Sequence, residues 1–321
     1  MRRPWLTSLI PLYSAGLMTK SALLDAGVLK QRRLQRPVIS IGSLSAGGAG
    51  KTPVVLMLAR LLTERGFVVG ILSRGYGRIT KDVLPVELAN DGLDAARFGD
   101  EPTEMAQAGL RVFVGSDRFA AGTLAESTSL QTIHLLDDGF QHRKLARDLD
   151  IVLLTRADIE DHLLPGGNLR EPLSALKRAK IVVVREEEDL AGLAAASGAA
   201  VWVVRRRLRL PPDRPTRPLA FCGIARPESF FAMLREAGCP VVGREALPDH
   251  HIYDEDDLTR LVNLARASHA NGFITTAKDA VKLDLARLAK VGPVAVARLE
   301  VELLDAETAL EPVLRLLRTT S

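Results

Sequence analysis

This sequence of 321 residues contains little cysteine and no long apolar run, and each absence excludes a class of protein. The two cysteines, Cys222 and Cys239, have neither metal-ligand nor redox spacing, so we expect reduced thiols in the core, as in cytosolic proteins. No stretch of about 20 residues is free of polar groups, which disfavours a membrane-spanning helix. A signal peptide could begin at Arg2-Arg3, but no acceptable small-x-small cleavage site follows.

The sequence also lacks an excess of positive charge outside its N-terminal part. The formal net charge is +4, but residues 1–36 hold seven basic side chains against one acidic side chain. The other residues hold 36 basic and 38 acidic groups. Because a nucleic-acid-binding protein carries its positive charge on the folded body, we expect no nucleic-acid partner. The charge instead marks residues 1–36 as a basic arm.

The basic arm also carries a repeated apolar pattern. Trp5, Leu9, Tyr13 and Leu17 recur every four residues, although Pro11 argues against one long straight helix. An aromatic and apolar face flanked by Lys and Arg suits a helix that lies among the headgroups of an anionic membrane. We expect this membrane-surface role; the alternative is a helix packed on the folded domain.

A glycine-rich segment between a predicted strand and a predicted helix carries the main functional signal. It consists of Ser45, Ala46, Gly47, Gly48, Ala49, Gly50, Lys51 and Thr52. This arrangement is typical of a P-loop, in which backbone N–H groups converge on phosphate oxygens at a helix N-terminus. Lys51 would reach the β- and γ-phosphates, and Thr52 would hold Mg²⁺. A plain Gly-rich connector is the alternative, which the flanking strand and helix disfavour.

Apolar, β-branched runs alternate with helical stretches, and this βαβ rhythm predicts a doubly wound parallel sheet. The predicted strands are Val38–Ile41, Val68–Leu72, Val112–Val114, Ile133–Leu136, Ile151–Leu154 and Ile181–Val184. Val83–Leu88 precedes Asn90-Asp91-Gly92 and could form an extra hairpin instead of a core strand.

A proline-rich stretch, residues 211–218, follows a further strand near Val201–Val204 and predicts a stiff connector. The sequence after it predicts strands at Leu219–Cys222 and Gly272–Thr275, and helices at Pro227–Ala237, Glu255–Ala270 and Ala306–Leu317. The prediction is therefore an α/β protein of the P-loop NTPase type. Its parts are the amphipathic arm (1–36), a core domain with a mostly parallel sheet (37–210) and a smaller α/β domain (211–321).

Two adjacent acids end the predicted strand Ile133–Leu136. Asp137 and Asp138 stand where a Walker B carboxylate would hold Mg²⁺ beside a P-loop, although two acids after a strand are commonly just a turn. Gln141 and His142 follow at the same edge. The pattern predicts a magnesium site.

Two other motifs could supply acid–base groups. Asp100 begins a helical stretch, where it could cap the helix or act as a base toward an attacking hydroxyl; the residues alone leave both roles open. Asp249 and His250 precede a helix in the second domain, and an acid could orient the imidazole. A pair of histidines is more often structural.

Several arginines follow predicted strands or open helices. Arg74 leaves the second strand in a flexible loop and suits an anionic ligand, or simply a tight turn; Arg118 opens a helix near the same sheet edge. Arg170 and Glu171 form an adjacent charge pair that could brace their loop. Lys278 and Asp279 are adjacent, unlike the residues of a guanine-reading motif, so ATP is favoured over GTP.

Taken together, these motifs resemble the tetraacyldisaccharide 4'-kinases, the lipid A 4'-kinases of Gram-negative bacteria. The resemblance rests on the P-loop with Ser45 in first position and on six further motifs, which appear in the family's order over roughly residues 1–283. They are Ser73-Arg74-Gly75-Tyr76-Gly77, Gly99-Asp100-Glu101-Pro102, Asp137-Asp138-Gly139-Phe140-Gln141-His142, Leu169-Arg170-Glu171-Pro172, Pro248-Asp249-His250 and Lys278-Asp279-Ala280-Val281-Lys282.

The resemblance implies ATP-dependent phosphorylation of the 4'-hydroxyl of a tetraacyldisaccharide 1-phosphate, giving lipid IVA, at the cytoplasmic face of the inner membrane. It implies that Asp100 is the base, that His250 is its partner across an interdomain cleft, and that Lys51, Thr52, Asp137 and Asp138 serve MgATP. The remaining candidates, for the disaccharide, its phosphate or the transition state, are Arg74, Arg118, Gln141, His142, Arg170 and Glu171. No protein partner is implied.

Two rival functions share part of these features. A membrane-associated ATPase switch also pairs a P-loop with an amphipathic helix, but its loop carries an extra lysine where this chain has Ala46. A soluble small-molecule kinase would leave the apolar arm unexplained. The lipid kinase accounts for both features.

Overall fold

A single continuous sheet of twelve described strands organises the protein. The computed structural model describes residues 4–87, 94–128, 130–283, 288–290 and 292–319. Within them the strand order is β10-β9-β11-β12-β8-β7-β6-β1-β5-β2-β4-β3. All neighbouring strands run parallel except β3 with β4 and β12 with β8. The predicted doubly wound, mostly parallel α/β sheet is confirmed.

The core sheet spans β1 to β8. Its strands are β1 (Val38–Ser43), β2 (Val69–Ser73), β3 (Leu84–Pro85), β4 (Arg111–Val114), β5 (Ile133–Asp137), β6 (Leu149–Leu153), β7 (Ile181–Arg185) and β8 (Ala200–Arg209). The central strand β1 lies between β5 and β6. Because these three strands are parallel, the loops after them meet at one edge of the sheet.

Helices cover both faces of this sheet because its strands are apolar on both sides. One face packs against α2 (Lys51–Thr63), α4 (Asp100–Gln107) and α13 (Glu311–Thr319), where Ile41, Leu58 and Val313 belong to one buried cluster. The other face packs against α5 (Arg118–Thr128) and α7 (Ala191–Ala195). The other short helices here are α3 (Asp94–Phe98), α6 (Arg156–Ile159), η2 (Leu173–Arg178) and η3 (Glu186–Glu188).

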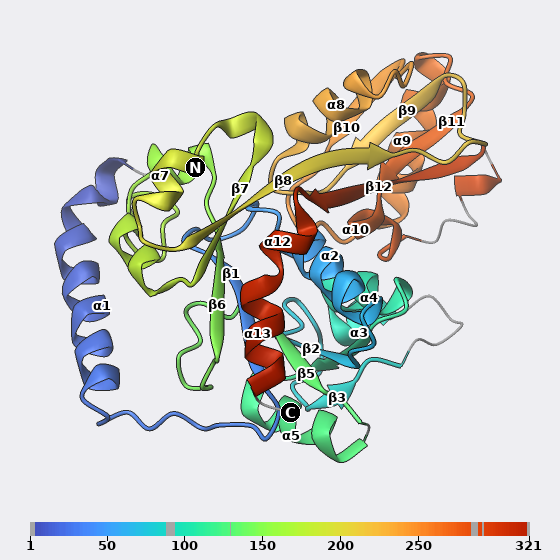
Figure 1. Ribbon diagram of the computed structural model, residues 1–321. Coiled ribbons are helices and arrows are strands. Elements are labelled where there is room, and N and C mark those ends of the chain that lie inside the picture. The colour runs from blue at the N-terminus through green and yellow to red at the C-terminus, as the bar shows by residue number, and fades with distance from the viewer. Residues whose placement is uncertain (1–3, 88–93, 129, 284–287, 291, 320–321) are drawn as a thin grey trace.

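The C-terminal half extends the same sheet. Its strands are β9 (Pro218–Cys222), β10 (Gly243–Ala246), β11 (Gly272–Thr276) and β12 (Val294–Leu303), and its helices are α8 (Pro227–Glu236), α9 (Glu255–Ala267) and α10 (Ala277–Ala280). The long strands β8 and β12 join the two halves as an antiparallel pair (Figure 1). After β12 the chain returns to the core through α12 (Ala306–Ala309) and α13.

Most predicted strands and helices are confirmed to within a few residues. Two strands, β10 and β12, had no counterpart in the prediction, and the predicted helix Ala306–Leu317 is divided into α12 and α13. In the segment Val83–Leu88, which could have formed an extra hairpin instead of a core strand, Leu84–Pro85 pairs antiparallel with β4 at the sheet edge. Leu88 and the Asn90-Asp91-Gly92 turn lie outside the described residues. The domain division at residue 210 stays a prediction.

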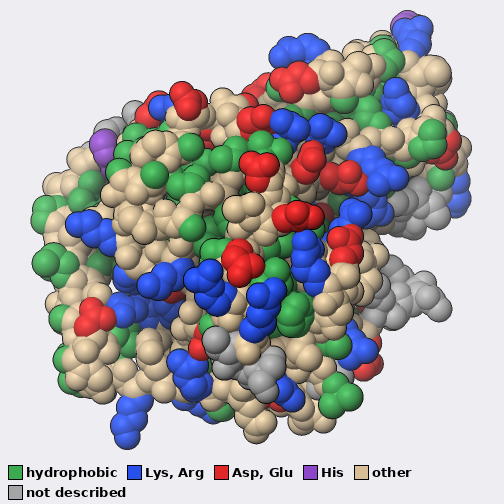
Figure 2. Space-filling model, in the orientation of Figure 1, with side chains coloured by type: hydrophobic (Ala, Val, Ile, Leu, Met, Phe, Trp, Pro, Cys, Tyr) green, Lys and Arg blue, Asp and Glu red, His purple; other side chains and the backbone are tan. Residues whose placement is uncertain are grey.

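The arm forms η1 (Pro4–Leu9) and α1 (Ile10–Asp25) along one side of the molecule (Figure 1). Trp5, Leu12 and Met18 are 76%, 74% and 72% exposed. The predicted four-residue stripe does not form one exposed face, because Tyr13 and Leu17 are half-buried against the core. Green hydrophobic side chains stand among polar ones at the left edge of Figure 2, over α1. Arg2 and Arg3 lie outside the described residues.

No helix among the described residues combines the length and apolar character needed to cross a bilayer.

Candidate functional site

The glycine-rich segment forms a tight loop between β1 and α2, as a P-loop does. Gly47, Gly48 and Gly50 have φ of 79°, 67° and 86°, left-handed values that other residues rarely adopt. The loop is held from outside, since the Ala46 N–H donates to the Asn168 carbonyl at 2.9 Å. Lys51 is the first residue of α2 and the Thr52 side chain is buried beside it. The backbone therefore presents N–H groups at a helix N-terminus, which suits phosphate.

The end of β5 faces the P-loop lysine. Lys51 Nζ lies 3.2 Å from Oδ1 of Asp138, and Arg170 Nη1 lies 2.7 Å from its Oδ2. Asp138 has a φ of 50°, which turns its carboxylate back from the strand. The predicted Walker B acid, the P-loop lysine and the loop arginine therefore form one charged cluster.

The pKa values of the two adjacent acids are shifted in opposite directions. Burial, together with the nearby negative charge of Glu101, raises the pKa of Asp137 to about 7. Burial also acts to raise the pKa of Asp138, but the charges of Lys51 and Arg170 outweigh it and hold that pKa below its usual value. Ser73 donates to Oδ2 of Asp137 at 2.9 Å, whereas Oδ1 is buried and accepts no hydrogen bond from any described residue. A cation at this oxygen would relieve its burial, so the acids fit a magnesium site.

Asp100 and His250 meet across the two halves of the molecule. Asp100 is the first residue of α4, after the cap residue Gly99, and its Oδ2 lies 3.1 Å from Nδ1 of His250. On the far side of the imidazole, Lys278 Nζ lies 3.3 Å from Nε2. The ring of Tyr76 packs at 5.3 Å between centroids. A carboxylate with a hydrogen-bonded imidazole can accept a proton from a hydroxyl group.

Two cavities connect these groups. One, of about 230 Å³, runs from Gly47–Thr52 to the apolar side chains of Leu208, Phe230 and Met233 in the other half. The larger, of about 680 Å³, is bounded by Lys51, both strand-end acids and His250. It also brings together most of the predicted substrate residues, namely Arg74, Arg118, Gln141, His142 and Arg170.

Two of these substrate candidates have shifted pKa values; Arg118 is buried and His142 is half-buried. Burial lowers the pKa of Arg118 to about 10, and its Nη1 donates to the carbonyls of Gly115 and Ser116 at 2.7 and 3.1 Å. Burial and the charges of Arg118 and Arg147 lower the pKa of His142 to about 4. At neutral pH the site therefore offers a charged guanidinium and a neutral imidazole.

The predicted pair of Arg170 and Glu171 is not formed. Arg170 reaches Asp138, whereas Glu171 pairs with Arg178 at 2.5 Å and accepts a hydrogen bond from Gln141 Nε2 at 3.2 Å. Gln141 Nε2 also donates to the carbonyl of Ser43. Glu171 thus braces the loop and Arg170 faces the cluster.

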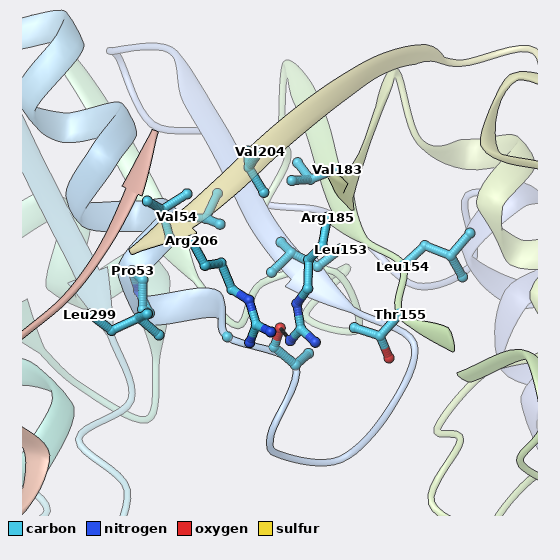
Figure 3. A pocket seen from close by; sticks show the side chains of 13 residues that line it. Pro53, Val54, Leu153, Leu154, Thr155, Val183, Arg185, Val204, Arg206 and Leu299 are labelled. Atoms are coloured by element: carbon cyan, nitrogen blue, oxygen red, sulfur yellow. Dashed lines mark hydrogen bonds between the residues drawn. The ribbon is translucent and has the colours of Figure 1, made fainter. Parts of the chain in front are cut away.

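Sequence reasoning missed several residues that surround the P-loop. Arg185 ends β7 and its Nη2 donates to the carbonyl of Ala49 at 2.9 Å, while Nη1 pairs with Glu188. Figure 3 shows the side chains of Arg185 and Arg206 side by side, and the pocket that they line also includes Ala49 and Gly50 of the P-loop. Lys282 lies near Asp100 and was quoted only as part of a motif. No local pattern signals these residues, because each acts through a neighbour that is distant in sequence.

Comparisons with known proteins give matches over almost the whole chain. The family model for tetraacyldisaccharide-1-P 4'-kinase matches residues 2–318. A protein named tetraacyldisaccharide 4'-kinase from Koribacter versatilis is 42% identical over 316 residues, covering 95% of this chain and 97% of its own. Its namesake from Geobacter metallireducens is 40% identical over 325 residues, covering 94% and 95%. A crystal structure of LpxK from Aquifex aeolicus in complex with ATP is 32% identical, with a TM-score of 0.78 and coverage of 97% and 98%.

Proposed function

Since this chain belongs to the family of tetraacyldisaccharide-1-P 4'-kinases, it is a transferase that phosphorylates the 4' position in lipid A biosynthesis, and we propose that ATP and the lipid headgroup enter its two cavities. ATP takes the smaller cavity, with its phosphates on Gly47–Thr52. The relative from Aquifex aeolicus, which is similar over 97% of this chain, was solved with ATP and supports this assignment.

Mg²⁺ is the second cofactor of the proposal. Thr52, Asp137 and Asp138 would hold it, and the unpaired Oδ1 of Asp137 is the observation that favours it. When bound, the ion neutralises charge on the phosphates. Lys51 provides a further positive charge where the transferred group loses its bond to ADP.

Asp100 is the proposed base, and its contact with His250 is the single observation that carries the proposal. The loose transition state of phosphoryl transfer asks little early deprotonation of the sugar hydroxyl. A carboxylate within hydrogen-bond reach of that hydroxyl therefore suffices. Oδ2 of Asp100 binds the imidazole, which leaves Oδ1 for the acceptor. His250 fixes the carboxylate, with Lys278 and Asp249 behind the ring.

The larger cavity accommodates the phosphorylated disaccharide headgroup. Arg74 and Arg118 supply positive charge, and neutral His142 supplies hydrogen bonds to sugar hydroxyls. Arg170, next to Asp138, stabilises charge that develops in the transition state. The product would be lipid IVA.

The acyl chains remain in the membrane while the headgroup reacts. The exposed apolar residues of the arm, including Trp5, Leu12 and Met18, would lie among the lipids at the cytoplasmic face of the inner membrane. The protein would then be peripheral or monotopic. In this proposal residues 1–36 anchor the protein to the membrane, the domain of residues 37–210 carries the P-loop, and the domain of residues 211–321 closes over the nucleotide.

The decisive experiment is transfer of ³²P from ATP to tetraacyldisaccharide 1-phosphate in mixed micelles. We expect ³²P to be incorporated into the lipid only when Mg²⁺ is present and the lipid is dispersed in detergent. Purified protein that hydrolyses ATP without ever labelling this lipid would instead act as an ATPase.

A further inference from the structure

Lys282 is a buried lysine that contacts the proposed base from the other half of the molecule. It follows α10 and its side chain is 5% exposed. Its Nζ lies 2.9 Å from Oδ1 of Asp279 and 3.8 Å from Oδ2 of Asp100. The ammonium group therefore stands between one carboxylate of its own half and one carboxylate of the P-loop half.

Asp279 holds this ammonium group in a fixed position. Its side chain is fully buried, and its Oδ2 accepts hydrogen bonds from the Gly223 N–H at 3.0 Å and from the Thr276 hydroxyl at 2.7 Å. A carboxylate that two donors hold at one oxygen keeps its other oxygen fixed beside Lys282. Since a buried ammonium group is stable only beside a negative charge, Lys282 stays near Asp279 and is directed at Asp100.

Asp100 is surrounded by charged groups from several elements. Oδ2 faces the His250 ring and Lys282 together. Behind the ring lie Lys278 and Asp249, and behind Lys282 lies Asp279. On its own helix, Glu101 adds negative charge, and Glu104 lines the same cleft. Lys282 is thus the buried cation that offsets this acidic surrounding directly at Asp100.

We propose that Lys282 is a positioning residue for phosphoryl transfer: it holds the Asp100 side chain turned toward His250, and does so only while the C-terminal half lies against α4. This inference rests on the proposed base role of Asp100. Both contacts of Asp100, with His250 and with Lys282, come from the C-terminal half. Approach of the two halves therefore orients the base.

A purely structural role is the competing explanation, because the Lys282–Asp279 pair also stabilises the C-terminal half. Lys282→Met keeps the length of the side chain but leaves Asp279 as an unpaired buried charge, which can prevent folding. The double variant Lys282→Met with Asp279→Asn removes both charges and keeps an oxygen for the Gly223 and Thr276 hydrogen bonds. It separates loss of the charge at Asp100 from loss of the fold.

The test measures lipid phosphorylation by full-length protein at pH 7, with ATP binding as the control for folding. For both Lys282 variants we expect kcat at pH 7 to fall about 10- to 100-fold, with KM for ATP within about twofold. The loss should appear in kcat and not in KM for ATP, which a purely structural role would change as well. Lys282→Arg should restore most of kcat.

A mutant cycle distinguishes failure of this inference from failure of the proposed base. If Lys282 acts through Asp100, adding Lys282→Met to Asp100→Asn lowers kcat no further than Asp100→Asn alone. Additive losses, or an undiminished kcat in the charge-neutral double variant, would overturn the role of Lys282 while the base stands. An Asp100→Asn enzyme with the full rate would overturn both.

Discussion

Nδ1 of His250 lies 3.1 Å from Oδ2 of Asp100, although the two residues are 150 positions apart in the chain. Asp100 is fixed by the start of α4, where the helix dipole favours its negative charge. His250 adopts a φ of 59° in a loop of the other half, where its N–H donates to Oδ1 of Asp249 at 3.1 Å. The pair therefore exists only where the two halves meet beside the P-loop.

Replacement of Asp100 by Asn should slow phosphoryl transfer and spare nucleotide binding. The amide keeps the size of the side chain but cannot accept the proton, so we expect kcat to fall by about 10²- to 10⁴-fold. The Kd for ATP, measured by calorimetry, should change less than about threefold because the phosphates lie on the P-loop. Asp213→Asn, in the exposed connector, is the matched control. An unchanged kcat removes Asp100 from the base role.

Replacement of Lys51 by Met should affect both binding and chemistry. Its ammonium group lies 3.2 Å from Asp138 and would contact the phosphates. Removing this positive charge should weaken ATP binding, and it should lower kcat further because the charge stabilises the transition state more than the bound substrate. We expect kcat/KM for ATP to fall by at least about 10²-fold. Lys81→Met, on an exposed loop, should retain the rate. A Lys51 variant with only a raised KM would limit this lysine to ground-state binding.

The core could be predicted from the sequence because its strands are buried on both faces. Ile39 and Ile41 of β1 belong to one buried cluster, and Leu44, just after β1, belongs to another. Strands that are buried on both faces have the continuous apolar runs that are typical of a parallel sheet. Strand β12 was missed because it alternates: Arg298 and Glu300 face solvent between partly buried neighbours, and it joins β8 as the antiparallel link between the halves. A search for continuous apolar runs does not detect such a strand.

The site divides in the same way. The positions of Gly47–Thr52 and Asp137-Asp138 at the sheet edge could be predicted because they depend on local spacing after a strand. The contacts of Lys282 and Arg185 could not, because they are made with Asp100 and Ala49, which lie far away in the chain. The pairing of Arg170 with Asp138 instead of Glu171 likewise depends on the tertiary structure.

Glu104 should make stability depend on pH. It lines the cavity beside the P-loop, and burial, reinforced by Glu101, raises its pKa from 4.5 to about 7. Between these values the folded state retains a proton that the unfolded state has lost, so the free energy of unfolding falls as the pH rises from about 4.5 to about 7. Glu104→Gln should remove this slope and stabilise the protein at pH 8 by on the order of 1–3 kcal/mol.

Urea unfolding at pH 4.5 and pH 8 checks this expectation. The variant and the parent should differ little in stability at the lower pH, where Glu104 is protonated in the folded state and only about half ionised in the unfolded state. Glu236→Gln, at the exposed end of α8, controls for the general effect of removing a carboxylate. Equal gains from both substitutions at pH 8 would assign the effect to net charge.

The arm should bind membranes through its exposed apolar side chains. Replacing Trp5, Leu12 and Met18 together by Ser removes three large side chains that are more than 70% exposed, and we expect at least a tenfold loss of binding to anionic vesicles, about 1.4 kcal/mol or more. Leu130→Ser, at an 84% exposed leucine outside the arm, is the control for surface hydrophobicity. Vesicle sedimentation that is unaffected by the triple change would contradict the membrane role.

Tyr13 should connect the arm to catalysis. Its hydroxyl donates to the backbone carbonyl of Arg170 at 3.0 Å, and the Arg170 side chain lies 2.7 Å from Asp138. Tyr13→Phe removes that hydrogen bond, typically worth about 1 kcal/mol, without changing the apolar surface of the arm. We expect a fall in kcat of about three- to tenfold at saturating lipid, with vesicle binding unchanged. Thr19→Ala, which removes an exposed hydroxyl from the same helix, is the matched control. Loss of vesicle binding in Tyr13→Phe would reduce the arm to an anchor, whereas a fall in kcat alone makes it part of the scaffold that orients Arg170.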